Sequence, residues 1–549
     1  MNSFVLKRFS LLLLLCGFLF FFGNNLVSLT DPDEVFYSLT AREMVNHNDW
    51  LTPYIFDQPQ FEKPILTYWF IKTAFNIFGE TPFAARFFPA VFATFGVLAV
   101  YALGLLCFMN ERKAFWAALI LATSAFYLAM GKTVFTDMIF TVFILYSLLS
   151  FYFAYSNPFY KKVGIIAFYI FAALAVLTKG PLGFLIPAGT IFLFLLYRKQ
   201  LSFLYSPWTI LGFLLGMLIA LPWYLFMYQQ YGQVFIHEFF YNDHWRRLMM
   251  AEHKGNDHWY FYPITMMAGV FPWSLLLGAA FVDLYKRLKS SAKPFEYFLL
   301  SWMLIVLFAF GFAHSKLASY ILPMFPALAL LIANYVDEKL ETYQYGIIRR
   351  LSYVVIGFLT ILGIGLIPAY KFYQVYIPTI MPVYWLSAGL LSISGISFTL
   401  LFIDKTRQAL ILLSFSLMPI LLTAFMITSN LEPYVSMQEV SLYLPSVQMM
   451  KSTILCIKPY TRGVRYYTHQ EVALLNLGGE NYFSPHPIPV ITSQEQLLAF
   501  LKSQPQTFAV VKKSGYEMFN KSYNKNFQVH VLKITGPNYV LRIEPIKIS

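Results

Sequence analysis

Charged residues are scarce in this chain. Lys, Arg, Asp and Glu together make up 12% of its 549 residues, whereas hydrophobic residues make up 58% and aromatic residues 19%. Because soluble domains carry about 25% charged residues, this composition excludes an ordinary soluble protein. The sequence therefore predicts a membrane protein.

Disulfide, zinc and phosphate-loop motifs are also lacking. Of the three cysteines, Cys456 stands alone in the last part of the chain, so that part cannot form a disulfide of its own. The histidines show no H-E-x-x-H spacing, which argues against an integral zinc enzyme. No glycine-rich phosphate loop is visible, so nothing indicates a sugar-nucleotide site.

Long apolar stretches are what the sequence has instead. A bilayer core of about 30 Å needs about 20 apolar residues per helix. About thirteen stretches qualify, at residues 9–29, 83–109, 114–130, 134–155, 163–178, 181–197, 207–228, 261–283, 295–313, 317–335, 351–370, 381–403 and 409–429. The first is too long for a signal-peptide core, which favours a retained span over a cleaved signal.

Basic residues in the short loops predict the orientation. If the N-terminus lies inside, every inner loop is basic, with Lys7, Arg8, Arg112, Lys113, Lys161, Lys162, Arg198, Lys199, Lys286, Arg287, Lys289, Lys293, Lys339, Arg349, Arg350, Lys405 and Arg407. This pattern is typical of cytoplasmic loops and places the tail from residue 430 outside. These loop charges account for most of the net charge of +13, so we reject a nucleic-acid partner.

A second set of bases lies near the predicted outer edge of the membrane. The preference for basic residues in cytoplasmic loops does not explain them there. The set comprises Arg42, Lys63, Arg86, Lys132, Lys179, Arg246, Arg247 and Lys316. A lone Lys at a helix end could simply snorkel toward lipid phosphates. Several cations from distant loops on one face instead predict a site for a phosphate carried by a lipid.

The first outer loop, residues 30–81, opens with the stretch DPDEVFYSLTAREM. Asp31 before Pro32, with Glu34 two residues further on, predicts an N-cap and the start of a helix. Apolar residues at helical spacing favour an amphipathic juxtamembrane helix along the membrane surface. Asp33 and Glu34 could simply complement its dipole.

Further charged residues stand at other outer helix ends. Glu62 and Lys63 lie between Phe61 and Pro64, and charges held at the edge of hydrocarbon are functional candidates unless they only pair with each other. The stretches GKTVFTDM, LTKGPLGF, HEFFYNDHWRRL and FAHSKLASYILP add Lys132, Asp137, Lys179, His237, Asp243, His244, Arg246, Arg247, Lys316 and Tyr320.

Several of these motifs resemble those of a known protein family. DPDEVFYSLTAREM, NDWLTPY, FEKPILTYWF, LTKG, FPWS and SKLASYILP, in this order over about residues 10–430, resemble the bacterial lipid A aminoarabinose transferases. These belong, with the protein O-mannosyltransferases, to the GT-C class of integral-membrane glycosyltransferases. The resemblance implies a mainly α, polytopic fold with about 13 transmembrane helices.

The resemblance also implies a reaction and a set of residues. A sugar would pass from a polyprenyl (undecaprenyl) phosphate to a lipid A or lipopolysaccharide acceptor on the periplasmic face of the bacterial inner membrane. The implied catalytic residues are Asp33 and Glu34. The residues implied to bind the acceptor are Tyr37, Arg42, Glu62, Lys63 and Asp137. Those implied to bind the phosphate of the donor lipid are Lys179, His244, Arg247, Lys316 and Tyr320.

One departure from the family pattern concerns the acceptor. The family often has Arg-Tyr where this chain has Phe36 and Tyr37, so a base expected to hold an acidic acceptor is missing. Transfer to a core sugar or to protein Ser or Thr therefore competes with lipid A. A transporter or flippase for an anionic lipid also stays open, although its site would be expected at mid-membrane between repeated halves.

Transfer by a single displacement would invert the configuration at the sugar and expel a polyprenyl phosphate, whose growing charge needs cations placed in advance. Lys179 and Arg247 suit that task. For a hydroxyl acceptor Asp33 would be the general base. For a phosphate acceptor no base is needed, and Asp33 would orient the acceptor, the donor sugar or a divalent metal ion.

The tail differs in composition from the rest of the chain. Residues 431–549 are more charged and carry strand-like runs, GVRYY, TFAVVKK, FQVHVLKI and NYVLRIEP. We expect a transmembrane domain at 1–430 and a small periplasmic α/β domain at 431–549, with a structural or acceptor-handling role.

Overall fold

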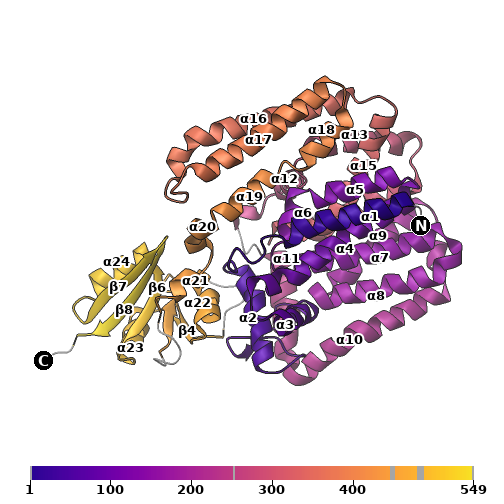
Figure 1. The fold of residues 1–549 in the computed structure, drawn as a ribbon. Helices are drawn as coiled ribbons and strands as arrows, with labels where there is room; N and C mark the ends of the chain where they lie inside the picture. Colours follow the sequence, from indigo (N-terminus) through magenta and orange to yellow (C-terminus); the bar gives the residue numbers. More distant parts are fainter. Residues whose placement is uncertain (1–2, 251–253, 445–451, 479–486, 547–549) are drawn as a thin grey trace.

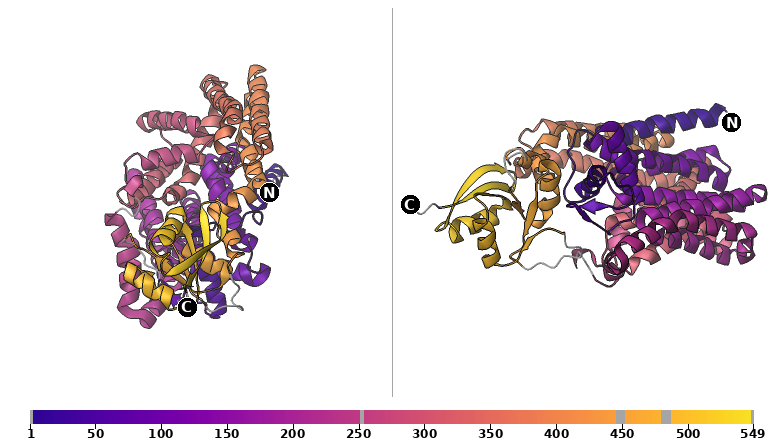
Figure 2. Two further views of the ribbon diagram at one scale, coloured as in Figure 1. Left: turned by 90° about the vertical axis from the view of Figure 1, so that its left-hand side faces the viewer. Right: turned by 90° about the horizontal axis from the view of Figure 1, so that it is seen from below.

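Two parts make up the molecule, a bundle of helices and a β-sheet beyond one end of it (Figure 1, Figure 2). The computed structural model describes residues 3–250, 254–444, 452–478 and 487–546. The chain is mainly helical, as the long apolar stretches and the family resemblance implied.

The N-terminal half of the bundle alternates long helices with short connections. Its helices are α1 (Ser3–Cys16), η1 (Gly17–Phe21), α4 (Pro82–Phe108), α5 (Glu111–Ala122), α6 (Ala125–Met130), α7 (Thr136–Ser156), η2 (Pro158–Tyr160), α8 (Lys161–Lys179), α9 (Leu182–Tyr197), η3 (Leu201–Leu204), α10 (Pro207–Ile236), η4 (His237–Arg246) and α11 (Arg247–Met249).

The second half continues to residue 435. Its helices are η5 (Lys254–Asn256), α12 (Phe261–Gly269), α13 (Ser274–Ser290), α14 (Pro294–Gly311), η6 (Ala318–Met324), α15 (Phe325–Glu341), α16 (Gly346–Tyr373), α17 (Met381–Phe402), α18 (Thr406–Ser414), α19 (Met418–Met426) and α20 (Thr428–Val435).

Nine helical segments of the described residues are long and apolar enough to cross a membrane, or ten if one bent pair counts as a span. They correspond to nine of the thirteen predicted stretches. The other four stretches, at 9–29, 114–130, 181–197 and 261–283, form helices that are shorter or broken. The protein is a multi-pass membrane protein, and the count of thirteen stays a prediction.

Local chemistry accounts for two of the breaks. Helices α12 and α13 meet at 114° across Pro272, which cannot donate a helical hydrogen bond. Between α5 and α6, the hydroxyls of Thr123 and Ser124 donate to the carbonyls of Leu119 and Ile120, at 2.7 Å each. Such side chains compete with the backbone and bend helices.

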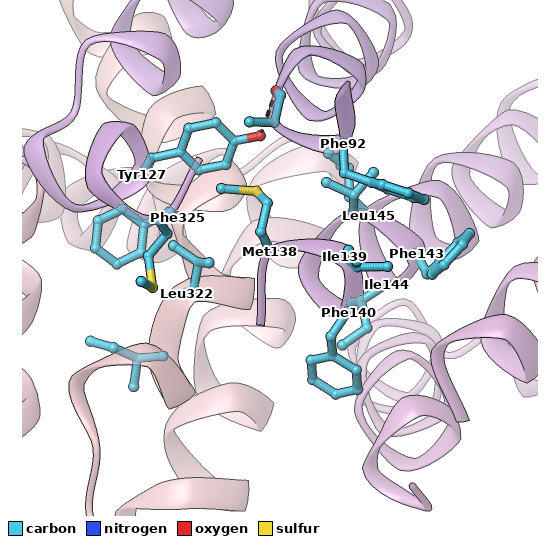
Figure 3. Packing of buried hydrophobic residues seen from close by; sticks show 14 of the residues in the cluster. Phe92, Tyr127, Met138, Ile139, Phe140, Phe143, Ile144, Leu145, Leu322 and Phe325 are labelled. Carbon is cyan, nitrogen blue, oxygen red and sulfur yellow. Dashed lines mark hydrogen bonds between the residues drawn. The ribbon is translucent and has the colours of Figure 1, made fainter. Parts of the chain in front are cut away.

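The bundle core is closely packed around α4, α6, α7 and η6 (Figure 3). The hydroxyl of buried Tyr127 donates to the carbonyl of Ala93 at 2.9 Å. A Cβ at Gly96 would lie 2.1 Å from that hydroxyl, so only glycine allows α4 and α6 to approach here. This packing fixes the start of α7, which carries Asp137.

The first outer loop folds into α2 (Asp33–Asn46), the short strands β1 (Tyr54–Ile55) and β2 (Gln58–Pro59), and α3 (Leu66–Phe78). Helix α2 begins where the sequence predicted, but Asp31 does not cap it, because its carboxylate accepts a hydrogen bond from the backbone N–H of Met437 instead, at 3.0 Å. The helix is not amphipathic as predicted, because residues 34–44 are all buried, between α3, β1 and helix α22 (Thr461–Thr468) of the C-terminal part. Its place along the membrane surface stays a prediction.

The C-terminal part contains a six-stranded sheet in the order β5-β4-β3-β6-β8-β7. Strands β3, β4, β5 and β6 pair in parallel, and β6, β8 and β7 pair antiparallel. Its elements are α21 (Gln438–Ser441), β3 (Ile454–Cys456), η7 (Lys458–Tyr460), α22 (Thr461–Thr468), β4 (Val472–Leu475), β5 (Val490–Ile491), α23 (Gln494–Lys502), β6 (Thr507–Lys512), α24 (Lys513–Ser522), β7 (Phe527–Thr535) and β8 (Asn538–Pro545).

Three of the four strand-like runs form strands β6, β7 and β8. The fourth, GVRYY, was predicted as a strand but lies in helix α22, which packs against α2. Gly463 of α22 makes this contact close, since a Cβ there would lie 2.4 Å from the carboxylate of Asp31. Burial raises the pKa of Asp31 well above its usual value.

Candidate active site

Asp33 and Tyr37 lie one turn apart at the start of α2, on the same face of the helix. Burial raises the pKa of the Tyr37 phenol well above its ordinary value, and the nearby carboxylates of Asp137, Asp33 and Glu62 raise it further. The charges of three carboxylates, from the first turn of α2, the loop before α3 and the first turn of α7, therefore act on one buried phenol.

Lys179 and Asp137 form a buried ion pair. Lys179 is the last residue of α8 and Asp137 lies in the first turn of α7, so each charge also complements a helix dipole. The Lys179 ammonium lies 4.4 Å from the centroid of the Tyr320 ring, a distance typical of a cation–π contact.

A second carboxylate, Asp243, lies between two bases. The ammonium of Lys63 is 2.7 Å and 2.9 Å from its two oxygens, and Nε of Arg247 is 3.3 Å from it. The Asp243 side chain is 7% exposed. Since Lys63 precedes α3 and the other two residues belong to η4 and α11, segments far apart in sequence meet at one carboxylate.

Glycine at position 180 allows η4 to approach the end of α8. Gly180 has φ +93°, and a Cβ there would lie 2.8 Å from Nε2 of His244. The other ring nitrogen of His244 donates to the carbonyl of Phe239 at 2.7 Å, which orients the imidazole toward Gly180.

The two ion pairs lie close together, since Gly180 follows Lys179 and its backbone lies against His244, which follows Asp243. Charge interactions of Lys179 with Lys63 and Asp243, and of Tyr320 with Arg247, agree with this placement. We call this set the outer cluster: Asp33, Tyr37, Glu62, Lys63, Asp137, Lys179, Asp243, His244, Arg247 and Tyr320.

The C-terminal part contributes one more base. The guanidinium of Arg462 on α22 lies 4.5 Å from the centroid of the Phe36 ring, and its Nη2 is 3.8 Å from Oε1 of Glu62. Arg462 thus stands beside the position at which the family pattern has an arginine. Nothing in the sequence singled it out, because its approach depends on how α22 packs on α2.

Glu34, predicted as catalytic beside Asp33, is engaged in a structural network. Its oxygens accept hydrogen bonds from Arg86 at 2.8 and 2.5 Å and from the backbone N–H groups of Val134 and Thr30, at 3.0 Å each. Although burial raises the pKa of Glu34, Arg86 and these donors bring it below its usual value. Glu34 therefore anchors the start of α2, which holds Asp33 in place.

Arg42 and Lys316 are not brought into the outer cluster. Arg42 follows Asp33 by about two and a half helical turns, so it lies on the opposite face of α2, where it donates to the carbonyls of Tyr466 and Arg465. Lys316 instead pairs with Asp257 at 2.7 Å, beside His314.

Among the described residues, no group of three His, Cys, Asp or Glu side chains could hold a metal ion. The chemistry available at the outer cluster is that of several cations and carboxylates beside buried phenols. Cations so placed can bind a phosphate, and Asp33 can accept a proton or a hydrogen bond.

Asp243 is a residue to which the sequence analysis gave no role. It was visible in HEFFYNDHWRRL as the acid next to a histidine and two arginines. That local pattern could have indicated a shared carboxylate, although its partner Lys63 lies 180 residues away.

Comparisons with known proteins support the resemblance that the motifs indicated. Residues 6–237 match the family model described as dolichyl-phosphate-mannose-protein mannosyltransferase. An undecaprenyl phosphate-alpha-4-amino-4-deoxy-L-arabinose arabinosyl transferase of Yersinia enterocolitica is 32% identical over 338 residues, which cover 60% of this chain and 59% of that protein. A protein of the same name from Serratia proteamaculans is 30% identical over 62% of each chain. The matched regions thus span about three fifths of these relatives.

Solved structures extend the likeness to the whole fold. ArnT from Cupriavidus metallidurans in the apo state matches with a TM-score of 0.79 at 17% identity, over 98% of both chains. The same protein bound to undecaprenyl phosphate matches with a TM-score of 0.74, also over 98% of both chains. The chain has the fold of that protein, C-terminal part included, and its predicted likeness to the aminoarabinose transferases is confirmed.

Proposed function

From this kinship and fold, we propose that the chain is an inverting glycosyltransferase. It moves a sugar from an undecaprenyl phosphate donor to a lipid A or lipopolysaccharide acceptor on the periplasmic face of the bacterial inner membrane. The curated relatives carry names of transferases for an aminoarabinose linked to undecaprenyl phosphate, which supports this donor.

The convergence of three bases at the outer cluster carries the proposal. Lys63, Lys179 and Arg247 come from three distant segments and share two carboxylates, Asp137 and Asp243. A departing polyprenyl phosphate gains negative charge, and bases already in place stabilise it without rearrangement. Tyr320, next to Lys179 and Arg247, can add a hydrogen bond to a phosphate oxygen.

Asp33 is the proposed catalytic carboxylate. It lies one helical turn from Tyr37, whose phenol also interacts with Asp137, and we assign it to the acceptor side of the cluster. With a hydroxyl acceptor it removes the proton as the bond to the sugar forms. With a phosphate acceptor, already ionised, it orients the acceptor or the donor sugar. A single displacement in either case inverts the anomeric centre.

Arg462 supports an acidic acceptor. The sequence places Phe36 where the family often has arginine, yet a guanidinium from α22 lies over that ring. A base is therefore present at the acceptor side after all, and it comes from the C-terminal part. This observation favours lipid A phosphate over a neutral core sugar or a protein hydroxyl.

The proposed topology follows the loop charges. The N-terminus lies inside, about thirteen segments cross the membrane, and the outer cluster and residues 431–549 face the periplasm. Residues 431–549 form the second domain of this proposal, and α22 gives that domain its acceptor-handling role.

Mass spectrometry of lipid A, core oligosaccharide and envelope proteins tests the function. Cells with the chain should carry an added sugar on lipid A that is absent from cells without it and from cells producing Asp33→Asn. Glu111→Gln, a change at the opposite end of the bundle, is the matched control and should keep the sugar. A sugar found only on core or protein would contradict the proposed acceptor, and no difference at all would contradict the transfer.

A further inference from the structure

Three buried threonines next to the outer cluster are joined by hydrogen bonds. Thr67 lies in the first turn of α3, Thr136 is the first residue of α7, and Thr178 is the last but one of α8. The hydroxyls of Thr67 and Thr136 are 2.8 Å apart, and the hydroxyl of Thr136 donates to the backbone carbonyl of Thr178 at 3.0 Å. Each of the three residues is at most 1% exposed, so water does not compete for these bonds.

The direction of this chain of hydrogen bonds follows from the donors available. A carbonyl oxygen can only accept, so the single proton of the Thr136 hydroxyl is directed to Thr178, and the Thr136 oxygen accepts from Thr67. The hydroxyl of Thr178 donates instead to the carbonyl of Leu174 within α8, at 2.7 Å. Thr136 is therefore the side chain that joins α3, α7 and α8.

Each threonine is close in sequence to a base or an acid of the outer cluster. Lys63 lies four residues before Thr67, and Asp137 and Lys179 directly follow Thr136 and Thr178. Lys63 belongs to the ion pair with Asp243, and Lys179 belongs to the ion pair with Asp137. The chain of hydrogen bonds thus ties the segments that carry the two ion pairs to each other.

Helix packing alone does not fix these helix ends. The last four carbonyls of an α-helix have no partner inside it, and the carbonyl of Thr178 is one of these in α8. Gly180, with φ +93°, follows and leaves the backbone free to turn. Neither α3 nor α7 has a side-chain cap at its start. Helix α7 itself is held in the core through Met138 and Phe140 (Figure 3), so Thr136 offers a fixed point to the other two helices.

We propose that Thr136 is a positioning residue for the transfer reaction. Its hydroxyl holds the end of α8 and the start of α3 at the separation that lets Lys179 and Lys63 act on one phosphate. This inference rests on the proposed function, since it takes the departing phosphate as the ligand of both bases. Bases held in advance stabilise the charge that grows on the leaving group, whereas loosened bases have to rearrange during the reaction. Loss of the hydroxyl should therefore lower kcat more than it raises KM for the donor lipid.

Steady-state kinetics of the full chain in lipid nanodiscs test this role. The donor is undecaprenyl phosphate-alpha-4-amino-4-deoxy-L-arabinose, which the names of the relatives specify, and the acceptor is lipid A. Thr136→Val removes the hydroxyl and keeps nearly the same shape. We expect kcat per folded protein to fall about 10–100-fold while KM for the donor stays within about threefold. Thr136→Ser restores the hydroxyl, so its kcat should return to within about threefold of the wild type.

A second variant and a matched control make the test independent of how well Thr136→Val folds. Thr67→Val removes only the donor to Thr136 and should lower kcat about 3–10-fold. Thr190→Val removes a hydroxyl that is equally buried but donates to the carbonyl of Ile186 within its own helix, at 2.8 Å, so kcat should be unchanged.

A merely structural role of Thr136 would reduce the amount of folded protein and leave kcat per folded molecule as in the wild type. That result, a wild-type kcat in Thr67→Val, or a Thr136→Ser variant as impaired as Thr136→Val would overturn the inference and leave the transfer by the wild-type chain standing. Absence of transfer by the wild-type chain would contradict the proposed function, and the inference with it.

Discussion

The two ends of the helix bundle both carry ion pairs, but the exposure of the paired side chains differs. Helix α4 runs from its start, where Arg86 pairs with Glu34 of α2, to the other end of the bundle, about 40 Å away. There, Arg112 pairs with both Asp337 and Glu341. Arg287 at that end similarly lies near Asp283, Glu296 and Glu338. Carboxylates are shared at both ends, since Lys63 and Arg247 share Asp243 as Arg112 and Arg407 share Glu341. The paired side chains of the outer cluster are at most 17% exposed, whereas those of Arg407 and Glu341 are each 45% exposed.

This difference separates a buried group of ion pairs from a more solvated one. Charges held away from water act on a ligand more strongly than charges that solvent and salt screen. Basic residues were predicted at both ends of the bundle, and we expect those of the outer cluster to act on a phosphate.

Loss of the Asp33 carboxylate should have the largest effect. Asp33→Asn is expected to lower the rate of sugar transfer to lipid A by about 10²–10⁴-fold, because Asp33 orients the acceptor or the donor sugar and orientation contributes several powers of ten to a rate. The rate per folded protein is measured with lipid A as the acceptor, and Glu111→Gln serves as the control. Wild-type turnover would mean that Asp33 only complements the dipole of α2.

Loss of the Lys179 charge should have the second-largest effect on sugar transfer. Lys179→Ala should reduce kcat/KM for the donor lipid by about 10–10³-fold, because one preorganised cation at the leaving group is lost. The double variant Lys179→Gln/Asp137→Asn keeps a polar pair without its charges. If Lys179 serves only to neutralise Asp137, the double variant should regain activity; we expect it to stay impaired.

Removal of the shared carboxylate should act in the opposite direction. Asp243→Asn leaves Lys63 and Arg247 without their common partner, so undecaprenyl phosphate should bind about 3–10-fold more tightly. Titration of the lipid against purified protein measures this. Weaker binding in Asp243→Asn would show that Asp243 positions the bases instead of competing with the phosphate.

The smallest effect on activity is expected at the opposite end. Arg112→Gln leaves the buried carboxylate of Asp337 with a weaker partner, which should cost about 1–3 kcal/mol of stability. Transfer per folded molecule should stay within about twofold of the wild type, since no residue of the outer cluster is near. Thermal unfolding and turnover of the same preparation measure both quantities.

Much of this comparison could be predicted from the sequence. Hydropathy located nine of the long helices, and the outer charges were recognised because ionised groups at a membrane margin are costly without partners. Pairings such as Lys63 with Asp243 could not be predicted, since only the packed fold brings residues so distant in sequence together.

The start of α2 shows where sequence reasoning failed. Asp31, Asp33 and Glu34 form one acidic run, but only Asp33 belongs to the outer cluster. Asp31 binds the C-terminal part through Met437, and Glu34 binds Arg86. Local patterns describe a helix start well, whereas the C-terminal part that buries α2 lies about 400 residues further along the chain.

The most direct test is the affinity of the full chain for undecaprenyl phosphate, measured by native mass spectrometry on two triple variants. Lys63→Gln/Lys179→Gln/Arg247→Gln removes three bases of the outer cluster, and Arg112→Gln/Arg287→Gln/Arg407→Gln removes three at the opposite end. We predict that the first variant binds the lipid more than about 100-fold more weakly and that the second binds it as the wild type does. Equal affinity in the two variants would contradict the assignment of the outer cluster as the donor-phosphate site.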